Sequence, residues 1–299
     1  GVRPNSELAE AAGLELSDRK GVIVNEYLQT SDPDIYAVGD VIAVRDLVTG
    51  ETTQVPLAGP ANRQGRIAAD NILRRRRVYR GTLGTSVVKV FSKTAASAGI
   101  TERRLKTLGK PYLKVYLHPY SHATYYPGAA SMSMKLLFDR DGKILGIQIV
   151  GEKGVDKRVD VIATAMLAGM DVFQLEELEL AYAPPYSAAR DPVNVAGMLA
   201  ANVLRGDTCL VYPDAIPESA FILDVREPSE VSEGVIPGAE MIPLGHLRAR
   251  LSELPKDRLI VTTCRVGLRG YLAERILRQN GFNAANLSGG LNTWKLYHD

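Results

Sequence analysis

A cysteine between an apolar segment and an arginine-rich turn offers the clearest chemistry in the sequence. The apolar segment Leu259–Thr263 predicts a buried strand, and Cys264 follows it directly. Free cysteine titrates at about 8.5, so its thiol needs help to ionise near neutral pH. A turn that opens a helix gives this help, because its N–H groups and the helix dipole favour an anion. We therefore expect Cys264 to act as a nucleophile that holds sulfur, first as a thiolate and then as a persulfide.

The turn after Cys264 supplies the other parts of this expected site. Arg265 and Arg269 add positive charge, and Gly267 permits the tight curl that points successive amides inward. The persulfide loop is completed by Val266, Leu268 and Gly270. The alternative is a buried structural thiol, since cysteine is among the most often buried residues. The second cysteine, Cys209, has no basic neighbour in sequence and is expected to be structural.

The segment from about Ala215 to Asp299 resembles the rhodanese family in four motifs that occur in the same order. The motifs are Asp224-Val-Arg226, Ile236-Pro-Gly-Ala239 with Ile242-Pro-Leu244, the turn Cys264–Gly270, and Ser288–Trp294. The resemblance implies an α/β domain that carries sulfane sulfur on its loop cysteine. Two positions differ from the pattern: Val235 stands where many members have histidine, and Gly270 where serine or threonine is common. We expect the second difference to remove a hydroxyl near the sulfur, and Asp224 and Arg226 to form a structural ion pair.

A second group of candidate binding residues lies near the start of the chain. Ile35–Val38 predicts a strand that ends at Gly39, whose missing side chain lets a ligand approach, and Asp40 can accept hydrogen bonds from hydroxyls. The segment Thr30–Asp40 resembles the second flavin-binding signature of the pyridine nucleotide-disulfide oxidoreductases. The resemblance implies that Gly39 and Asp40 approach the ribityl chain of FAD. It also implies that a helix start facing the flavin includes Pro56, Leu57 and Ala58.

The middle of the chain resembles the interface domain of coenzyme A disulfide reductases and related persulfide or polysulfide reductases. Two segments carry this resemblance, His122-Ala-Thr-Tyr-Tyr-Pro-Gly128 and Ala181-Tyr-Ala-Pro-Pro-Tyr-Ser187. No histidine lies between His122 and His246, which excludes the histidine–glutamate pair of glutathione-reductase relatives.

In coenzyme A disulfide reductases, tyrosines cross a dimer interface to reach the thiol and flavin of the partner. The resemblance therefore implies a homodimer in which Tyr126 and Tyr182 donate hydrogen bonds to a leaving thiolate. Their neighbours Tyr125 and Tyr186 are alternatives for this role. Ordinary interface packing is the other interpretation, because tyrosine is common at such surfaces.

The elements expected to position these residues form three blocks. Residues 1–80 are expected to be the C-terminal part of an FAD-binding, Rossmann-like domain, and residues 81–204 an α+β dimerisation domain with an antiparallel sheet. A linker at 205–214 leads to an α/β rhodanese domain at 215–299, with a mostly parallel sheet. The predicted strands are Val22–Val24, Ile35–Val38, Val87–Phe91, Tyr112–Leu117, Met132–Phe138, Ile144–Val150, Phe221–Val225 and Leu259–Thr263. The predicted helices are Pro60–Arg77, Asp156–Ala168 and Gly270–Asn280, and Asp139–Gly142 predicts a hairpin turn.

Composition and charge exclude several other classes of protein. The net charge of +2 gives no general argument for binding nucleic acid, and no apolar run could span a bilayer. Two cysteines form no disulfide framework and favour a reducing cytoplasm. His118 and His122 have no third ligand nearby, so we expect no metal. The run Arg74–Arg77 could bind the phosphates of coenzyme A or a nucleic acid, but a solvated helix end is favoured.

The resemblance also implies the activity of a longer enzyme. The family's glycine-rich motif, redox cysteine and NAD(P)H-binding domain lie N-terminal to a segment like Gly1–Asn5, so the chain is expected to be a C-terminal part. Such an enzyme uses NAD(P)H and FAD to reduce a coenzyme A disulfide, a coenzyme A persulfide or polysulfide. The alternatives are a stand-alone thiosulfate or persulfide sulfurtransferase, and an NADH oxidase-type flavoprotein with a regulatory rhodanese module.

Overall fold

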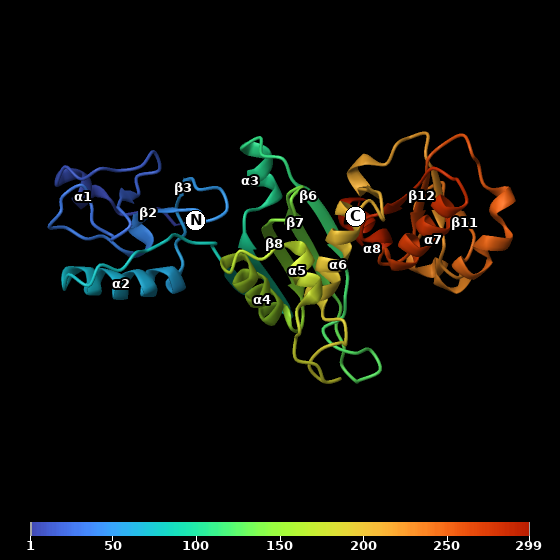
Figure 1. Ribbon diagram of the computed structural model, residues 1–299, viewed down its shortest axis with the longest axis horizontal. Coiled ribbons are helices and arrows are strands. Elements are labelled where there is room, and N and C mark those ends of the chain that lie inside the picture. The colour runs from blue at the N-terminus through green and yellow to red at the C-terminus, as the bar shows by residue number, and fades with distance from the viewer. Residues whose placement is uncertain (1, 299) are drawn as a thin grey trace. The chain divides into compact units, whose positions relative to one another are not determined.

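A computed structural model describes residues 2–298 of the chain (Figure 1). Its contacts divide the chain into two compact units, Gly1–Val87 with Ser97–Ile100, and Val88–Ala96 with Thr101–Asp299. Within residues 2–298, no helix combines the length and the apolar character that crossing a membrane requires.

The first unit is built on a small three-stranded sheet with one long helix. Its elements are α1 (Glu7–Ala11), β1 (Val22–Ile23), the 3-10 turn η1 (Gly39–Val41), β2 (Ile42–Arg45), β3 (Thr52–Thr53) and α2 (Ala58–Ile72). Strand β1 pairs in parallel with β2, and β2 pairs antiparallel with β3. The core joins the sheet to α2, because Ile42 and Val44 pack with Ile67 and Ala68.

Two expectations for this unit are wrong. The segment Ile35–Val38 is not a strand, because its only ladder contact is a single bridge between Tyr36 and Gln29. A run of apolar residues becomes a strand only when a neighbouring strand accepts its hydrogen bonds. The predicted helix Pro60–Arg77 in fact starts at Ala58 and ends at Ile72.

The arginine run lies beyond that helix for a local reason. Arg74 and Arg76 have φ angles of 61° and 51°, in the left-handed region that ends a helix. Arg75 and Arg77 turn back to the carboxylate of Asp70, at 3.0 and 2.7 Å. Two of the four arginines in the run therefore share one carboxylate partner.

A five-stranded sheet, which we call the central sheet, lies mostly in the second unit. Its strands are β4 (Ser86–Val90), β5 (Lys93–Gly99), β6 (Leu113–Leu117), β7 (Met132–Phe138) and β8 (Ile144–Gly151), in the order β4-β5-β8-β7-β6. Strands β6, β7 and β8 pair antiparallel, as expected, and the turn at Asp139–Gly142 joins β7 to β8. The helices are α3 (Glu102–Thr107), α4 (Val155–Leu167), α5 (Val172–Glu177) and α6 (Pro192–Leu204). Helices α4, α5 and α6 lie over one face of this sheet (Figure 1).

The C-terminal sheet is wholly parallel and completes the expected α/β architecture. Its strands are β9 (Leu210–Val211), β10 (Phe221–Asp224), β11 (Glu240–Met241), β12 (Ile260–Thr263) and β13 (Ala284–Leu287), in the order β11-β10-β12-β13-β9. Around it lie the helices α7 (Leu268–Gln279) and α8 (Gly290–His298) and the short turns η2 (Pro213–Ala215), η3 (Pro228–Glu233), η4 (Leu244–Ala249) and η5 (Leu251–Glu253). Successive residues of β12 face opposite cores: Ile260 packs with Leu277 of α7, and Val261 with Leu291 of α8. Both faces of the sheet are thus covered, and the expected fold class is confirmed.

Candidate functional site

The C-terminal ends of the parallel strands bring three of the expected motifs to one edge of the C-terminal sheet. Asp224 ends β10, Cys264 directly follows β12, and Ser288 directly follows β13. Strands β10 and β12 are neighbours in register, as are β12 and β13. In open α/β sheets this edge is where ligands bind.

Cys264 is 1% exposed, and its sulfur faces the backbone of the following turn. The N–H of Gly267 donates a hydrogen bond to Sγ over 3.2 Å. Gly267 has φ +96°, a conformation that residues with side chains rarely adopt, and it directly precedes α7. A helix N-terminus has N–H groups without helical partners, so this position favours a sulfur anion.

The glycine pair Gly289–Gly290 presses the start of α8 against the back of the same loop. Both glycines have positive φ, and a Cβ at Gly290 would clash with the carbonyl oxygen of Cys264. The N–H of Leu291 donates to the Cys264 carbonyl over 2.8 Å, and that of Asn292 to the Arg265 carbonyl over 3.0 Å. The loop carbonyls are thus held away from the sulfur. Holding them is the physical role of the motif Ser288–Trp294.

Each arginine of the loop has a carboxylate partner that sequence reasoning missed. Arg269 makes two hydrogen bonds to Glu230, of 2.6 and 2.7 Å, and Arg265 lies 3.3 Å from Glu233. The hydrogen bonds from Arg269 lower the pKa of Glu230 to about 2. Glu230 and, to a smaller extent, the sulfur of Cys264 raise the pKa of Arg269. The expected positive charge is therefore present at the loop but largely balanced by the two glutamates.

A buried ion pair fixes the segment that carries these glutamates. Arg226 is fully buried, and its guanidinium donates to both carboxylate oxygens of Asp224. It also donates to the carbonyls of Glu230 and Gly234, over 3.1 and 2.8 Å. The expected ion pair is confirmed. Nothing in the sequence marked Glu230 or Glu233 beyond their place shortly after the Asp-x-Arg motif.

The expectation that Gly270 removes a hydroxyl near the sulfur stays a prediction, but the surroundings of Gly270 show a second reason for a glycine. A Cβ at this position would point into the sheet, where it would clash with Asn286 Oδ1 and lie 3.4 Å from the Thr262 carbonyl. Gly270 instead allows the first turn of α7 to approach strands β12 and β13 closely.

The two cysteines lie at opposite edges of the C-terminal sheet. Cys209 is exposed and directly precedes β9, whereas Cys264 is buried and directly follows β12. Because all strands of this sheet run in parallel, the starts and ends of strands lie at opposite edges. Cys209 is therefore not placed to form a disulfide with Cys264.

In the first unit, the residues expected to contact a flavin gather at the start of α2. The N–H of Gly39 donates to Gln64 of α2 over 2.7 Å, and Gly39 approaches Ala61 of the same helix. Asp40 is exposed, and Leu57 precedes α2 without a side-chain cap. Pro56 and Ala58 flank that position. An open carboxylate beside uncapped helix N–H groups fits the hydroxyl and polar ring edges of a flavin cofactor.

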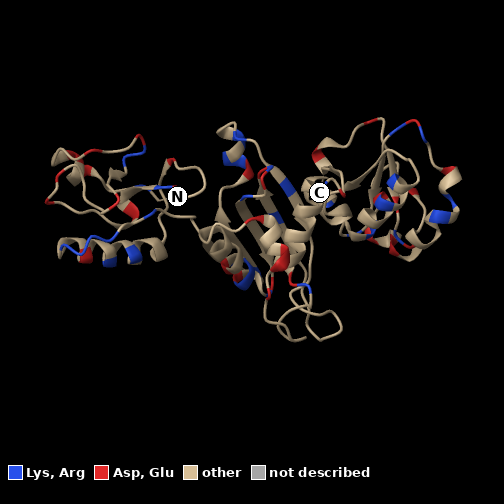
Figure 2. Ribbon diagram, in the orientation of Figure 1, with Lys and Arg blue, Asp and Glu red and all other residues tan. Residues whose placement is uncertain are grey.

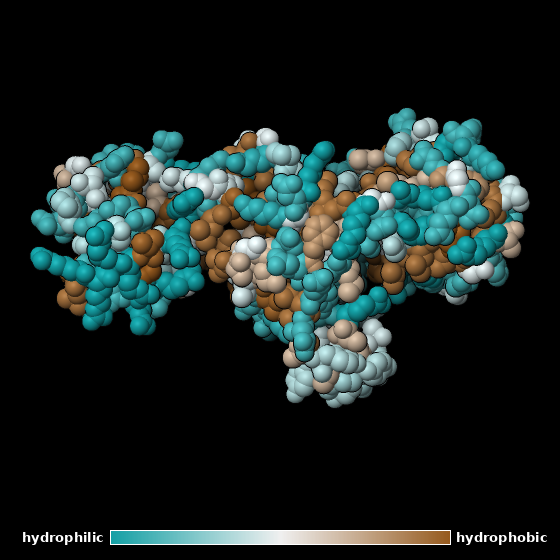
Figure 3. Space-filling model, viewed as in Figure 1, coloured by the Kyte–Doolittle hydropathy of each residue, from teal (hydrophilic) through white to brown (hydrophobic). Residues whose placement is uncertain are grey.

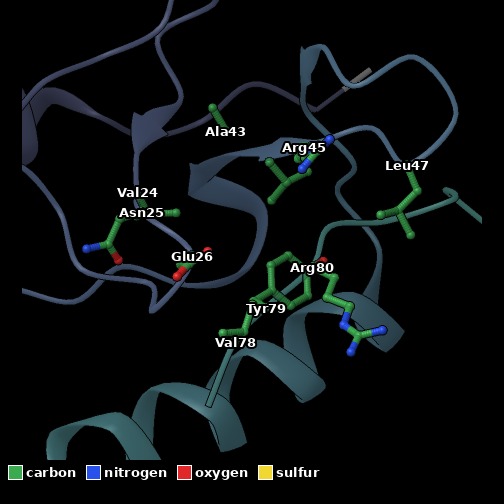
Figure 4. A pocket seen from close by; sticks show the side chains of 10 residues that line it. Val24, Asn25, Glu26, Ala43, Arg45, Leu47, Val78, Tyr79 and Arg80 are labelled. Atoms are coloured by element: carbon green, nitrogen blue, oxygen red, sulfur yellow. The ribbon is translucent and has the colours of Figure 1, made fainter. Parts of the chain in front are cut away.

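A hollow of about 500 Å³ in the first unit lies apart from these residues (Figure 4). It is lined by Val24, Asn25, Glu26, Ala43, Val44, Arg45, Leu47, Val78, Tyr79 and Arg80. The buried hydroxyl of Tyr79 has no hydrogen-bond partner among the described residues. None of the residues expected to bind the flavin lines this hollow.

The expected tyrosines lie on two loops, one between β6 and β7 and the other between α5 and α6. The first tyrosine loop is residues 118–131 and the second is residues 178–191. The N–H of Ala123 in the first loop donates to the carbonyl of Ser187 in the second over 3.0 Å, and the loops lie side by side in Figure 1. Residues 118–131 and 180–189 include no charged side chain. This part of the protein is uniformly tan in Figure 2 and pale in Figure 3.

The structure pairs Tyr182 with Tyr125. Their hydroxyl oxygens are 2.9 Å apart, and this hydrogen bond raises the pKa of Tyr182. Tyr126, the first choice from sequence, instead packs edge-on against His122 with ring centroids 5.9 Å apart. Tyr186 is 73% exposed and has no side-chain contact that places it in the pair. Exposed phenols that meet in an uncharged loop can donate hydrogen bonds to an incoming group.

A second buried arginine, which sequence reasoning missed, holds both tyrosine loops. Arg158 of α4 is 1% exposed and donates to Asp191 over 2.9 Å. The same guanidinium donates to the carbonyl of Ser121 over 2.8 Å and to the hydroxyl of Ser187 over 3.2 Å. The pKa of Asp191 is lowered, since hydrogen bonds from Ser187, Val193 and Arg158 outweigh its burial. An arginine inside a predicted helix gives no sequence signal for this role.

The histidines of the first tyrosine loop have structural partners. His118 is buried, with Nδ1 3.0 Å from Ser133 Oγ and Nε2 2.7 Å from Thr293 Oγ1. Burial lowers the pKa of His118 to about 4. His122 Nδ1 contacts Ser121 Oγ. Among residues 2–298, no three histidine, cysteine or carboxylate side chains are grouped as a metal ion would require.

The fold and these sites define a class of protein: parts of a pyridine nucleotide-disulphide oxidoreductase joined to a rhodanese-like domain. Residues 1–65 match the model of the pyridine nucleotide-disulphide oxidoreductases, and residues 85–192 match the dimerisation domain of that family. Residues 213–297 match the rhodanese-like domain. The chain belongs to the pyridine nucleotide-disulphide oxidoreductase family and carries a rhodanese-like domain.

Three relatives show which members of this family the chain is similar to. Coenzyme A disulfide reductase of Staphylococcus haemolyticus is 38% identical over 199 residues, 66% of this chain and 45% of that protein. The crystal structure of reduced Bacillus anthracis CoADR-RHD matches with a TM-score of 0.96 and 49% identity, over 98% of this chain and 54% of that one. A NAD-dependent persulfide reductase from A. fulgidus matches with a TM-score of 0.92 and 42% identity, over the same shares of both chains. The chain thus spans about half the length of these relatives.

Proposed function

We propose that this chain forms part of an FAD-dependent NAD(P)H reductase of coenzyme A disulfide, coenzyme A persulfide or polysulfide. Its fused rhodanese domain carries sulfane sulfur on Cys264. The proposal rests on the sulfur of Cys264 facing the Gly267 amide at the start of α7. The names of the relatives support the choice of sulfur substrates, and thiosulfate is a further donor to be tested.

The geometry around Cys264 suits sulfur transfer by two simple displacements. The Cys264 thiolate attacks the outer sulfur of a donor persulfide, R–S–SH. The bond between the donor's two sulfurs breaks, R–S⁻ leaves, and a persulfide forms on Cys264. An acceptor thiolate then attacks the outer sulfur and restores the Cys264 thiolate. The Gly267 N–H and the start of α7 stabilise the anion on either sulfur, while Glu230 and Arg226 hold the loop in place.

A matched pair of cysteine variants tests this part of the proposal. Cys264→Ser removes the nucleophile, so transfer of sulfur from a persulfide or thiosulfate to an acceptor thiol falls to background. Cys209→Ser changes an exposed thiol at the opposite edge of the sheet and keeps the parent rate. Mass spectrometry after incubation with the donor finds the added sulfur atom on Cys264 alone. Equal activity of the two variants would refute the sulfur-carrying role.

The reductase part of the proposal assigns roles to the first unit and to the tyrosine loops. Asp40, Gly39 and the start of α2 hold FAD, which when bound passes two electrons from NAD(P)H to a disulfide. Tyr182, through its hydrogen bond with Tyr125, donates to the thiolate that leaves the substrate. Tyr126 packs against His122 and positions the first tyrosine loop.

We further propose that the chain forms a homodimer in which α6 lies at the interface. The match to a dimerisation domain supports this, and so does the composition of α6, which includes no charged residue in thirteen. Met198 and Leu199 of α6 are only partly buried in the single chain. A mostly apolar helix without charged residues is normally covered.

A charge on the incompletely covered side of α6 tests the dimer. Leu199→Glu would bury a carboxylate at the interface and dissociate the dimer, as measured by sedimentation or light scattering. The control is Leu296→Glu, at a position of α8 that is 70% exposed, which should leave the oligomeric state unchanged. A monomeric parent protein would refute the proposal.

The free thiols and the sulfur chemistry are consistent with a cytoplasmic location.

A further inference from the structure

The loop that carries Cys264 depends on a residue outside it. Asn286 of β13 lies beside Thr262 of β12 in the sheet and is 3% exposed. Its Nδ2 donates a hydrogen bond to the carbonyl of Gly267 over 3.1 Å. Gly267 is the residue whose N–H reaches the sulfur of Cys264. Asn286 therefore binds directly to the residue whose N–H would stabilise the sulfur anion.

The carbonyl of Gly267 needs such an anchor because its residue is a glycine. Without a side chain, Gly267 has unusually free rotation about its backbone bonds. Its carbonyl accepts from the N–H of Tyr271, the first bond of α7, and from Asn286. The peptide that follows Gly267 is planar, so a fixed carbonyl also fixes the direction of the Leu268 N–H. That N–H is one of the helix-start donors without a partner inside the helix.

Stability alone does not explain an asparagine at this position. The Oδ1 atom of Asn286 is buried and has no hydrogen-bond partner among the described residues. An unpaired buried acceptor costs free energy, which an apolar side chain of similar size would avoid. The reverse orientation of the amide would place two acceptors, Oδ1 and the Gly267 carbonyl, against each other. Asn286 thus lowers the stability of the fold through its unpaired Oδ1, while its Nδ2 donates one hydrogen bond to the loop.

Gly270 provides the space that this donor requires. A Cβ at position 270 would clash with Asn286 Oδ1, so any larger residue would displace the amide. Thr262, the neighbour of Asn286, donates to the Gly270 carbonyl over 2.9 Å. The first turn of α7 therefore rests on two polar side chains of the sheet, and only glycine fits above them.

We propose that Asn286 is a positioning residue for the sulfur site: it holds the carbonyl of Gly267, and so fixes the backbone of the residue whose N–H faces the sulfur of Cys264. The inference rests on the proposed sulfur-carrying role of Cys264. It adds a residue from the neighbouring strand to a loop that is otherwise contiguous in sequence.

The test measures the reactivity of Cys264 in the whole chain with Cys209→Ser as background, so that only one thiol reports. Asn286→Leu removes the donor and the unpaired oxygen together, so the thermal midpoint stays or rises. Alkylation of Cys264 by iodoacetamide at neutral pH slows by about fivefold to tenfold, and its pH profile moves to higher pH. Asn286→Asp keeps the shape but offers no donor, and slows alkylation at least as much. The matched control is Asn280→Leu, since the amide of Asn280 binds the Ile276 carbonyl at the far end of the same helix.

A double-variant cycle separates this role from general packing. Gly270→Ala slows alkylation while Asn286 is present and has no further effect in an Asn286→Ala protein, where the clash is gone. Parent-like alkylation in both Asn286→Leu and Asn286→Asp would overturn the inference. An equal effect of Gly270→Ala with and without Asn286 would also overturn it. If Asn286→Leu does not fold, Asn286→Asp and the cycle distinguish these outcomes. Alkylation requires no sulfur donor, so its result is independent of whether the chain transfers sulfur.

Discussion

The sulfur loop, residues 264–270, and the two tyrosine loops are held by the same kind of buried ion pair. They differ in how much of the proposed site each one contains. Each rests on a fully buried arginine that pairs with an aspartate and donates to loop carbonyls or hydroxyls: Arg226 with Asp224, and Arg158 with Asp191. Above this support, Cys264 is buried and already faces its amide donor. Tyr125 and Tyr182 are 76% and 45% exposed, and their hydroxyls hydrogen-bond to each other.

The difference indicates how each site works. The sulfur loop holds its cysteine, its amide donor and its balancing charges at one edge of a sheet, so the proposed sulfur transfer would need only this domain. The tyrosine pair offers hydroxyl donors on a rigid base but no reacting group of its own. We therefore expect disruption of the sulfur loop to reduce sulfur transfer by the rhodanese-like domain. Changes to the tyrosines should alter activity only in reactions whose substrate reaches them.

The largest effect is expected from breaking either buried ion pair. Arg226→Met and Arg158→Met each leave a buried carboxylate without its partner, which costs about 3–5 kcal/mol of unfolding free energy. Thermal or urea unfolding measures the loss. Arg226→Met also loses sulfur transfer, whereas Arg158→Met keeps it under conditions in which it is folded.

The control for this comparison is an exposed ion pair. Arg250 pairs with Glu253, and both side chains are at least 40% exposed, so Arg250→Met should change stability by less than about 1 kcal/mol. If Arg158→Met abolished sulfur transfer as completely as Arg226→Met, the two supports would not be independent.

An intermediate effect is expected from His118, which joins the first tyrosine loop to α8 through Thr293. Its folded pKa of about 4 lies below the unfolded value of about 6.5, so the unfolded chain binds more protons between these values. Stability from this group is complete above pH 6.5. It falls as the pH drops from 6.5 to 4, by at most about 3 kcal/mol.

His118→Gln removes the titration and should flatten the dependence of unfolding free energy on pH in that window. Thr293→Val is the control: it removes the hydrogen-bond partner and lowers stability, but it leaves the pH dependence in place. An unchanged slope in His118→Gln would contradict the assignment.

The smallest effect on stability is expected at the exposed tyrosines. Tyr125→Phe and Tyr182→Phe each remove one hydroxyl at the surface and should change unfolding free energy by less than about 0.5 kcal/mol. Reduction of a coenzyme A disulfide by the protein that contains this chain should fall in both variants. The double variant should fall by less than the product of the two, because the hydroxyls act as one pair. Parent-like reductase turnover in both would exclude the pair from that activity.

Much of the fold could be predicted because its signals are local. Strand β7 was predicted at its observed bounds, and β6, β8, α4 and α7 to within two residues at each end. The apolar period of each segment and the glycines and prolines at its ends identify these elements. The strand expected at Ile35–Val38 failed because pairing depends on a neighbour that the segment itself does not encode. Strand β5 was missed because Lys93–Gly99 consists mostly of small residues without a clear alternation.

The sequence alone indicated the sulfur loop, since its cysteine, glycine and arginines lie within seven consecutive residues after a strand. It also identified the tyrosine segments and the glycine–aspartate turn before α2. Only the tertiary structure decided which tyrosine contacts Tyr182, which atoms a side chain at position 270 would meet, and which side chains hold the loops. Glu230, Asn286 and Arg158 act on residues that lie 39, 19 and between 4 and 37 positions away along the chain. Such contacts depend on strand register and helix packing, which local patterns do not specify.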